Sequence, residues 1–298
     1  MSLEPIEALG FYNLKNFDAE LIRHYDNSVY KIKTEKTYAL RICSPKTTAK
    51  RLQAEVDWLT VLKDTNLMVP KPVANKQGDL ISHLEDRCCI LFEWLEGEPV
   101  SQIMSPQVAK QIGEMMATLH LQASNYYSDR EYAQCYDSNY FFGANSWWQT
   151  KAKECLANDY EKITPAVEKA KYLINSLSQS PQQFGMIHSD LHFSNIISDG
   201  KKYAVIDFGD CGLGYYLMDI AVTEAEFKDY DNGEQLIAAF QESYQNQRGF
   251  FPPSRDIEIF EVISSLLWLE WIFESESQQV REDKAQWLTP IIKKIRDI

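Results

Sequence analysis

Residues 188–195 read His-Ser-Asp-Leu-His-Phe-Ser-Asn, and residues 205–209 read Val-Ile-Asp-Phe-Gly. The first stretch has the pattern H-x-D-L-x-x-x-N and the second ends in D-F-G, the two signatures that carry the base and the metal ligands of phosphoryl-transfer sites. In this pattern Asp190 is the candidate base that orients an accepting hydroxyl. Asn195 and Asp207 are the candidate Mg²⁺ ligands, because Mg²⁺ prefers oxygen ligands. The two stretches therefore predict a site for Mg-ATP.

The sequence around these stretches predicts a β-hairpin. Residues 196–197 and 203–206 form short apolar runs, and an Asp-Gly turn lies between them at residues 199–200. Two such runs joined by this turn predict antiparallel strands, with one candidate metal ligand near each end. A lone Asp-Phe-Gly is most often only a turn, and a lone His is most often structural. Both patterns in this order, across one hairpin, favour a functional site.

The same residues resemble the aminoglycoside phosphotransferase and choline kinase superfamily, whose fold is similar to that of protein kinases. His192 stands where protein kinases carry Lys, and Ser189 replaces the Arg of H-R-D. Only a dozen residues separate Asp207 from Asp219, which leaves no room for a phosphorylatable activation loop. The resemblance implies that Asp219 is a structural anchor of the catalytic loop and that His188 supports that loop. It also implies ATP and Mg²⁺ as cofactors.

The resemblance covers roughly residues 21–221 and implies a fold class. We expect an α+β, two-lobed protein-kinase-like fold. Residues 1–95 would form an N-terminal nucleotide-binding lobe built on an antiparallel sheet. Residues 96–298 would form a larger, mainly helical C-terminal lobe for catalysis and substrate binding.

Composition sets limits on partners and location. The chain has 298 residues, 45% of them hydrophobic, and a net charge of −13, which suits a folded protein with a sizeable core and disfavours nucleic acid and anionic membranes as partners. The six cysteines show no C-x-x-C pair, and no run of about 18 apolar residues occurs. We therefore expect a cytoplasmic protein that does not span a membrane. Its oligomeric state stays open.

The N-terminal part of the chain has strand-like patterns and a turn in the position of a kinase phosphate loop. Residues 28–32 and 37–42 have the pattern of strands, and a helix is expected from about Thr47. The turn before the first of these strands stands where a kinase places its glycine-rich loop, but it contains no glycine. Asn27 and Ser28 are candidates for phosphate contacts there, and simple turn formation is the alternative.

Three further positions would bind the nucleotide by resemblance. Arg41 stands where a kinase has the Lys of V-A-I-K, and a guanidinium can hold phosphate in the same way. Glu55 on the following helix is its candidate ion-pair partner; a solvated helix carboxylate is the alternative. Residues 89–97 resemble the hinge between kinase lobes, so adenine would bond to the C=O of Glu93 and the N–H of Leu95.

The C-terminal half predicts helices and an aromatic-rich segment. Ser105-Pro106 is a typical helix start. Further helical stretches are expected between residues 151 and 177, broken at Pro165. The aromatic residues between Tyr126 and Trp148 either pack under a loop or line a pocket, and packing is the preferred interpretation.

A long helix is expected after Pro253, and its distal part is a candidate substrate site. Glu270 and Glu274 are four residues apart, with Trp271 on a neighbouring face. An aromatic face with nearby carboxylates can hold an ammonium group, and choline kinases use a helix of this kind. The alternative is that Trp271 is simply a core residue.

Taken with the resemblance, these residues predict that the γ-phosphoryl of Mg-ATP is transferred to a hydroxyl of a small molecule. Family members act on aminoglycosides, choline, homoserine and sugars, so amine-bearing acceptors are included. Two alternatives stay open. One is an atypical Ser/Thr protein kinase, because some of these share the fold. The other is a nucleotide-binding regulator without catalysis, which the missing glycine loop and Arg41 would suit.

Overall fold

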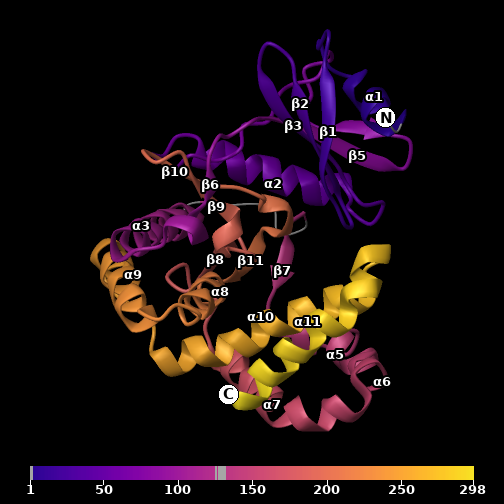
Figure 1. The fold of residues 1–298 in the computed structure, drawn as a ribbon. Helices are drawn as coiled ribbons and strands as arrows, with labels where there is room; N and C mark the ends of the chain where they lie inside the picture. Colours follow the sequence, from indigo (N-terminus) through magenta and orange to yellow (C-terminus); the bar gives the residue numbers. More distant parts are fainter. Residues whose placement is uncertain (1–2, 125, 127–131) are drawn as a thin grey trace.

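The computed structural model describes residues 3–124, 126 and 132–298. It has the predicted α+β arrangement of two lobes, with an antiparallel sheet in the N-terminal lobe and a mainly helical C-terminal lobe (Figure 1). The N-terminal sheet has five antiparallel strands in the order β1-β2-β3-β5-β4. The strands are β1 (Asp18–His24), β2 (Ser28–Lys33), β3 (Thr37–Ile42), β4 (Ser82–Leu84) and β5 (Arg87–Glu93).

Helices α1 (Leu3–Leu9) and α2 (Ala49–Leu62) belong to the same lobe. The interior strand β5 is apolar at successive positions because both of its faces are covered. Leu91 belongs to a small core cluster with residues of α1, and Ile90 belongs to the large core cluster with residues of α2. This placement fixes α2 against the sheet.

The start of α2 follows its sequence. The Thr48 side chain accepts a hydrogen bond from the Arg51 N–H, the usual arrangement of an N-cap. The helix therefore starts close to the predicted position, and Leu52, Val56 and Leu59 are buried at helical spacing.

The C-terminal lobe combines helices with two small three-stranded sheets, ordered β10-β9-β6 and β7-β11-β8. Helices α3 and α9 lie side by side, and α10 and α11 form an antiparallel pair near the C-terminus (Figure 1). The helices are α3 (Pro106–Ala123), α4 (Ser138–Phe142), α5 (Trp147–Thr150), α6 (Ala152–Leu156), α7 (Tyr160–Ser176), α8 (Leu217–Phe227), α9 (Gly233–Arg248), α10 (Ser254–Glu274) and α11 (Gln278–Asp297). The strands are β6 (Glu98–Pro99), β7 (Gln134–Tyr136), β8 (Phe184–Ile187), β9 (Ile196–Ser198), β10 (Tyr203–Val205) and β11 (Gly212–Tyr215). Short 3₁₀ turns are η1 (Val100–Ile103), η2 (Ala157–Asp159), η3 (Phe193–Asn195) and η4 (Phe208–Asp210).

The predicted hairpin around the two candidate metal ligands is confirmed. Strands β9 and β10 pair antiparallel, with Ile196 opposite Val205 and Ser198 opposite Tyr203. Gly200 in the connecting turn has φ 85°, a left-handed conformation that glycine adopts without strain.

The predicted break at Pro165 is wrong, because α7 continues through that residue. Proline removes the hydrogen bond to the carbonyl four residues earlier. Ile163, Ala166 and Val167 are buried around it, and this packing outweighs the lost bond. The helical region is interrupted earlier, at Lys151 and at η2.

The aromatic-rich segment is mainly packed in the core, as preferred from the sequence. Phe141, Phe142, Trp147 and Trp148 are all buried, whereas Tyr127 lies outside the described residues.

Within the described ranges, no helix is both long and apolar enough to cross a membrane. The lobe boundary after residue 95 stays a prediction.

Candidate active site

The catalytic loop is held by one buried carboxylate. Asp219, in the first turn of α8, is fully buried. Its Oδ2 accepts the His188 N–H at 2.9 Å, and its Oδ1 accepts the Ser189 N–H at 2.7 Å. Ser189 has φ 67°, a strained conformation for a residue with a side chain. These two hydrogen bonds hold that conformation, as expected of the anchor predicted from the sequence.

His120 supports this anchor and was missed in the sequence. Its Nε2 lies 3.2 Å from Asp219 Oδ2, its Nδ1 lies 2.8 Å from the Tyr244 hydroxyl, and its ring stacks on Tyr216 at 4.4 Å. Burial lowers the pKa of His120 more than Asp219 raises it. His120 lies in the last turn of α3, 99 residues from Asp219, so no local signal connects the two.

Asp190, the candidate base, adjoins the candidate metal ligand Asn195. Asn195 Nδ2 donates to Asp190 O at 2.9 Å and to Asp190 Oδ2 at 3.1 Å. His192 Nε2 lies 3.3 Å from the same carboxylate oxygen. Burial acts to lower the pKa of His192, but the hydrogen bond and charge of Asp190 outweigh it and leave that pKa raised. The Asp190 carboxylate is therefore oriented from two sides.

The β9–β10 hairpin brings Asp207 to the same place. The Ile206 N–H donates to the Asn195 C=O at 2.9 Å, and His188 Nε2 lies 2.9 Å from the Ile206 C=O. Asp207 itself has φ 62° and ψ 57°, a left-handed backbone that is uncommon outside glycine and often found at functional sites. His188 thus has the supporting contact that the sequence predicted.

The residues present fit Mg²⁺. The Asn195 amide nitrogen is used by Asp190, which leaves the amide oxygen as the atom able to bind a metal. Asp207 adds a carboxylate, and hard oxygen ligands of this kind suit Mg²⁺. Burial acts to raise the pKa of Asp207, but the Arg23 guanidinium outweighs it and leaves that pKa below its usual value. The carboxylate is therefore held in its charged, metal-binding form.

Arg23, which donates to Asp207 Oδ2, was also missed. The pairing of β1 with β2 shifts between Leu21, opposite Tyr30, and Arg23, opposite Val29. Such a bulge inserts one residue and re-aims the side chains that follow. Alternation along β1 therefore does not reveal which way Arg23 points.

Arg41 and Glu55 form the predicted ion pair between β3 and α2. Both are buried, at 6% and 3% exposure, so solvated Glu55 is ruled out. Burial acts to lower the pKa of Arg41, and the Glu55 charge reverses this and raises it. One helical turn earlier, Arg51 Nη2 donates to Asp210 Oδ1 at 2.9 Å. Arg51 could have been found from the sequence, because it lies four residues before Glu55 and therefore on the same helix face.

Asn27 and Ser28 make local contacts in this structure. Asn27 Oδ1 accepts the Ser44 N–H at 2.8 Å, and Ser28 Oγ lies 2.9 Å from His24 Nδ1. Both contacts stabilise the turn. Asn27 also lines a cavity of about 10 Å³ together with Arg41, so the phosphate role stays a prediction beside the turn role.

Glu93 and Leu95 lie at the end of β5 and in the connection that follows it. Glu93 ends β5, and its N–H donates to the Lys71 C=O at 2.9 Å. Leu95 follows in the connection towards β6. The backbone contacts to adenine stay a prediction.

The candidate substrate residues on α10 all have partners. Glu270 accepts the Tyr140 hydroxyl at 3.0 Å, and Glu274 pairs with Lys151 at 2.6 Å. Burial raises the pKa of Glu270, although Tyr140 acts to lower it. Trp271 does not stand free as an ammonium site. Its ring stacks on Trp287 with centroids 5.3 Å apart, and its Nε1 donates to Asp26 Oδ2 at 2.6 Å.

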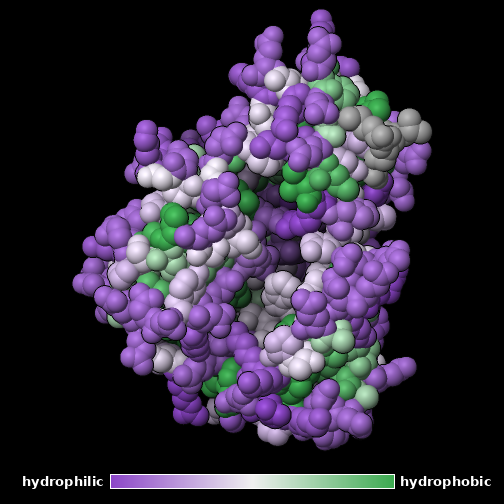
Figure 2. Space-filling model, in the orientation of Figure 1, coloured by the Kyte–Doolittle hydropathy of each residue, from purple (hydrophilic) through white to green (hydrophobic). Residues whose placement is uncertain are grey.

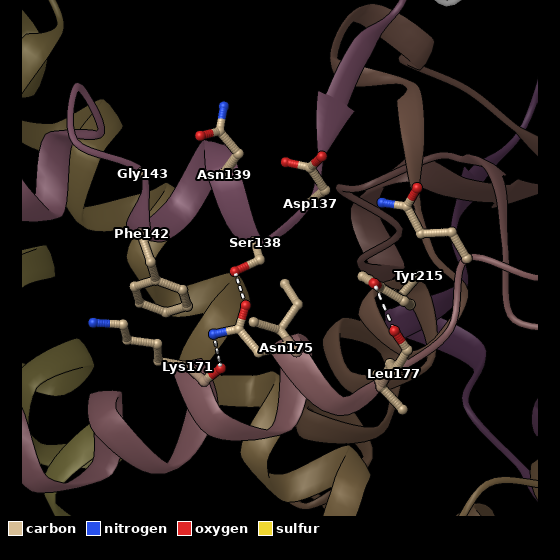
Figure 3. A pocket seen from close by; sticks show the side chains of 11 residues that line it. Asp137, Ser138, Asn139, Phe142, Gly143, Lys171, Asn175, Leu177 and Tyr215 are labelled. Carbon is tan, nitrogen blue, oxygen red and sulfur yellow. Dashed lines mark hydrogen bonds between the residues drawn. The ribbon is translucent and has the colours of Figure 1, made fainter.

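The molecule is hollowed between its two lobes, and hydrophilic residues are visible within the hollow (Figure 2). A separate groove of about 610 Å³ lies between α4 and α7 and is lined by none of the candidate site residues. Ser138 donates to Asn175 and Tyr215 to Leu177 at its edge (Figure 3). The candidate site instead lies where Arg23 and Arg51 of the N-terminal lobe contact Asp207 and Asp210.

Residues 18–255 match the model of the phosphotransferase enzyme family. The chain belongs to this family. An amicoumacin kinase of Bacillus subtilis (strain 168) is 22% identical over 227 residues, which cover 72% of this chain and 65% of that kinase. The chain thus spans a little less than two thirds of this relative.

Solved structures agree on the fold. A microcompartment-associated aminopropanol kinase superposes with a TM-score of 0.79 at 20% identity, covering 99% of this chain and 94% of the other. An amicoumacin kinase in complex with AMP-PNP, Ca²⁺ and Ami also gives 0.79, at 17% identity, covering 99% and 92%. At these identities the likeness establishes the fold, which is that of the kinase-like phosphotransferases predicted from the sequence.

Proposed function

We propose that this chain transfers the γ-phosphoryl group of Mg-ATP to a hydroxyl group of a small molecule. The observation that carries the proposal is the contact between the Asp190 carboxylate and the Asn195 amide, with Asp207 joined to Asn195 through the adjacent backbone. A base and two oxygen ligands in one place are what phosphoryl transfer requires. Family membership and the small-molecule kinases among its relatives support the same reaction.

In this reaction Asp190 orients the acceptor hydroxyl and takes its proton. A bond forms between the hydroxyl oxygen and the γ-phosphorus, the bond from that phosphorus to the β–γ bridging oxygen breaks, and ADP leaves. Arg41, fixed by Glu55, holds the α- and β-phosphates. When bound, Mg²⁺ on Asn195 and Asp207 would neutralise charge on the β- and γ-phosphate oxygens.

We include amine-bearing acceptors in this proposal. Tyr136 donates to the Asp210 C=O at 2.8 Å and packs against Tyr140 at 5.2 Å, and Tyr140 donates to Glu270. This chain of contacts connects the catalytic segment with a carboxylate on α10. Carboxylates beside aromatic rings favour cationic groups. The names of the relatives, aminopropanol kinase among them, point to the same class.

The protein-kinase alternative lacks structural support. The residues between Asp207 and Asp219 form η4, β11 and the start of α8, so that span contains no separate activation segment. The regulator alternative is opposed by the presence of the candidate base Asp190 and of both candidate metal ligands, Asn195 and Asp207.

A cytoplasmic location is part of the proposal, since ATP is the phosphoryl donor.

ADP release from Mg-ATP tests this function. The protein would be assayed with amino alcohols, aminoglycosides, amino acids and sugars, with Asp207→Ala protein as the blank. We expect release that depends on one acceptor class and is absent in the blank. Mg-dependent ATP binding without release for any acceptor class would contradict the proposed activity and revive the regulator.

A further inference from the structure

Asp26 makes one of the contacts between the two lobes. It lies in the turn between β1 and β2, and both of its carboxylate oxygens accept hydrogen bonds from the end of α10. Oδ2 accepts the Trp271 Nε1–H at 2.6 Å, and Oδ1 accepts the Ser275 hydroxyl at 2.8 Å. The Ser275 N–H donates to the Trp271 C=O at 2.9 Å. The two donors are thus one helical turn apart on one face, which suits the two oxygens of a carboxylate.

Aromatic packing surrounds this contact. The Trp271 and Trp287 rings stack with centroids 5.3 Å apart and planes 23° apart. Tyr25, next to Asp26, packs edge-on against both, at 6.1 Å and 6.3 Å. Edge-to-face and offset arrangements at such distances are favourable. The hairpin tip is therefore held by two hydrogen bonds and by a shielding aromatic cluster.

A neighbouring loop of the N-terminal lobe reaches the same corner. Lys46 Nζ donates to the Glu274 C=O at 3.0 Å and lies 3.1 Å from a Glu276 carboxylate oxygen. That loop is tied to the hairpin, because the Ser44 N–H donates to Asn27. The contact at Asp26 is thus part of a small interface between the turn region and the α10–α11 corner.

We propose that Asp26 is a positioning residue, which sets the phosphate-binding turn over the cleft by binding Trp271 and Ser275 on the acceptor-side helix. The same hairpin carries Arg23, which contacts Asp207, so a shift of the turn would move it relative to the metal site. The turn has no glycine, so the usual close approach of a glycine-rich backbone to phosphate is not available. An external contact supplies the missing restraint. The proposal rests on the function proposed above.

The consequence is a link between the two substrates. Glu270, beside Trp271, contacts Tyr140 on the acceptor side, so an acceptor that moves α10 also moves the phosphate turn. If the contact at Asp26 is lost, the turn must be ordered by the nucleotide itself, and nucleotide affinity falls.

Binding of Mg-AMP-PNP, measured by calorimetry, tests this proposal. Trp271→Phe keeps an aromatic ring, although a smaller one, and removes the donor, and Asp26→Asn keeps the shape and removes the charge. We expect each variant to raise the Kd by about tenfold, the size of one charge-assisted hydrogen bond. The double variant should be no weaker than either single one, because both remove the same contact. Glu20→Gln is the matched control, since it removes an exposed ion pair with Lys33 on the same hairpin and should bind as the parent does.

Hydrogen exchange of the turn amides in the nucleotide-free protein is the second readout. Exchange at residues 25–28 should rise in Asp26→Asn and Trp271→Phe but not in Glu20→Gln. The positioning role of Asp26 would be overturned if the Kd values and the exchange were both unchanged, or if the losses in the double variant were strictly additive. Either result would leave the proposed function intact. Parent protein that binds no Mg-AMP-PNP would instead overturn the proposed function, and this proposal with it.

Discussion

At the residue scale, the site shows which roles a sequence can reveal. Asp190, Asn195 and Asp207 lie on one loop and one hairpin, so their spacing alone predicted their proximity. Arg23 and His120 reach the site across 184 and 99 residues. A β-bulge aims Arg23, and tertiary packing places His120, so neither left a local pattern.

Arg23 gives a prediction about metal binding. Its guanidinium contacts Asp207 Oδ2, so Arg23 and a metal compete for the same carboxylate. Arg23→Gln should therefore tighten binding of Mn²⁺, a paramagnetic substitute for Mg²⁺, to nucleotide-free protein. Since Arg23 is 41% exposed, we expect only about fivefold, or about 1 kcal/mol. Electron paramagnetic resonance titration measures it, with Arg23→Lys as the charge-retaining control. Weaker Mn²⁺ binding by Arg23→Gln would contradict the competition.

Glu224 gives a prediction about pH. It is 4% exposed, accepts from Gln241 at 2.8 Å, and burial raises its pKa to about 7. The folded state then binds more protons than the unfolded state between about pH 4.5 and 7, so this group makes the free energy of unfolding fall as pH rises through that window. Glu224→Gln should flatten the fall, by up to about 3 kcal/mol. Urea unfolding across this range measures it. An equal slope in both proteins would show that Glu224 is not responsible.

At the element scale, elements with local signals were the ones predicted. The start of α2 near Thr47 and the Asp-Gly turn between β9 and β10 were predicted from neighbouring residues. The course of α7 through Pro165 was not predicted, because it depends on packing around the helix, and neighbouring residues give no signal of that packing. Helices α1 and α11 lie outside the range that the family resemblance covered, and neither was predicted.

The ion pair between β3 and α2 gives a prediction at this scale. Arg41→Met leaves the Glu55 charge buried without its partner, which should lower the free energy of unfolding by about 3–5 kcal/mol. Arg41→Met combined with Glu55→Met replaces the pair by apolar side chains and should recover most of this loss, although ATP binding stays impaired. Urea unfolding and calorimetry measure the two effects separately. A double variant no more stable than Arg41→Met would show that the unpaired Glu55 charge is not the cause of the loss.

At the scale of the whole molecule, the large apolar core includes residues of both lobes, and three charged or polar contacts add to it. Arg23 reaches Asp207, Arg51 reaches Asp210 and Asp26 reaches Trp271. All three start in the N-terminal lobe; the first two end at Asp207 and Asp210, and the third ends on α10. The fold class was predictable because the family motif implies it. The Asp26–Trp271 contact was not, because it joins residues 245 positions apart.

The fate of the γ-phosphoryl group tests the central claim most directly. Protein supplied with γ-labelled ATP and an acceptor found in the panel would be compared with its Asp190→Asn variant. We predict that the label appears in a phosphate monoester of the acceptor, and that Asp190→Asn lowers this rate by about 10²-fold or more while ATP binding is retained. Label found only as inorganic phosphate, or an undiminished rate in Asp190→Asn, would contradict transfer to a hydroxyl with Asp190 as the base.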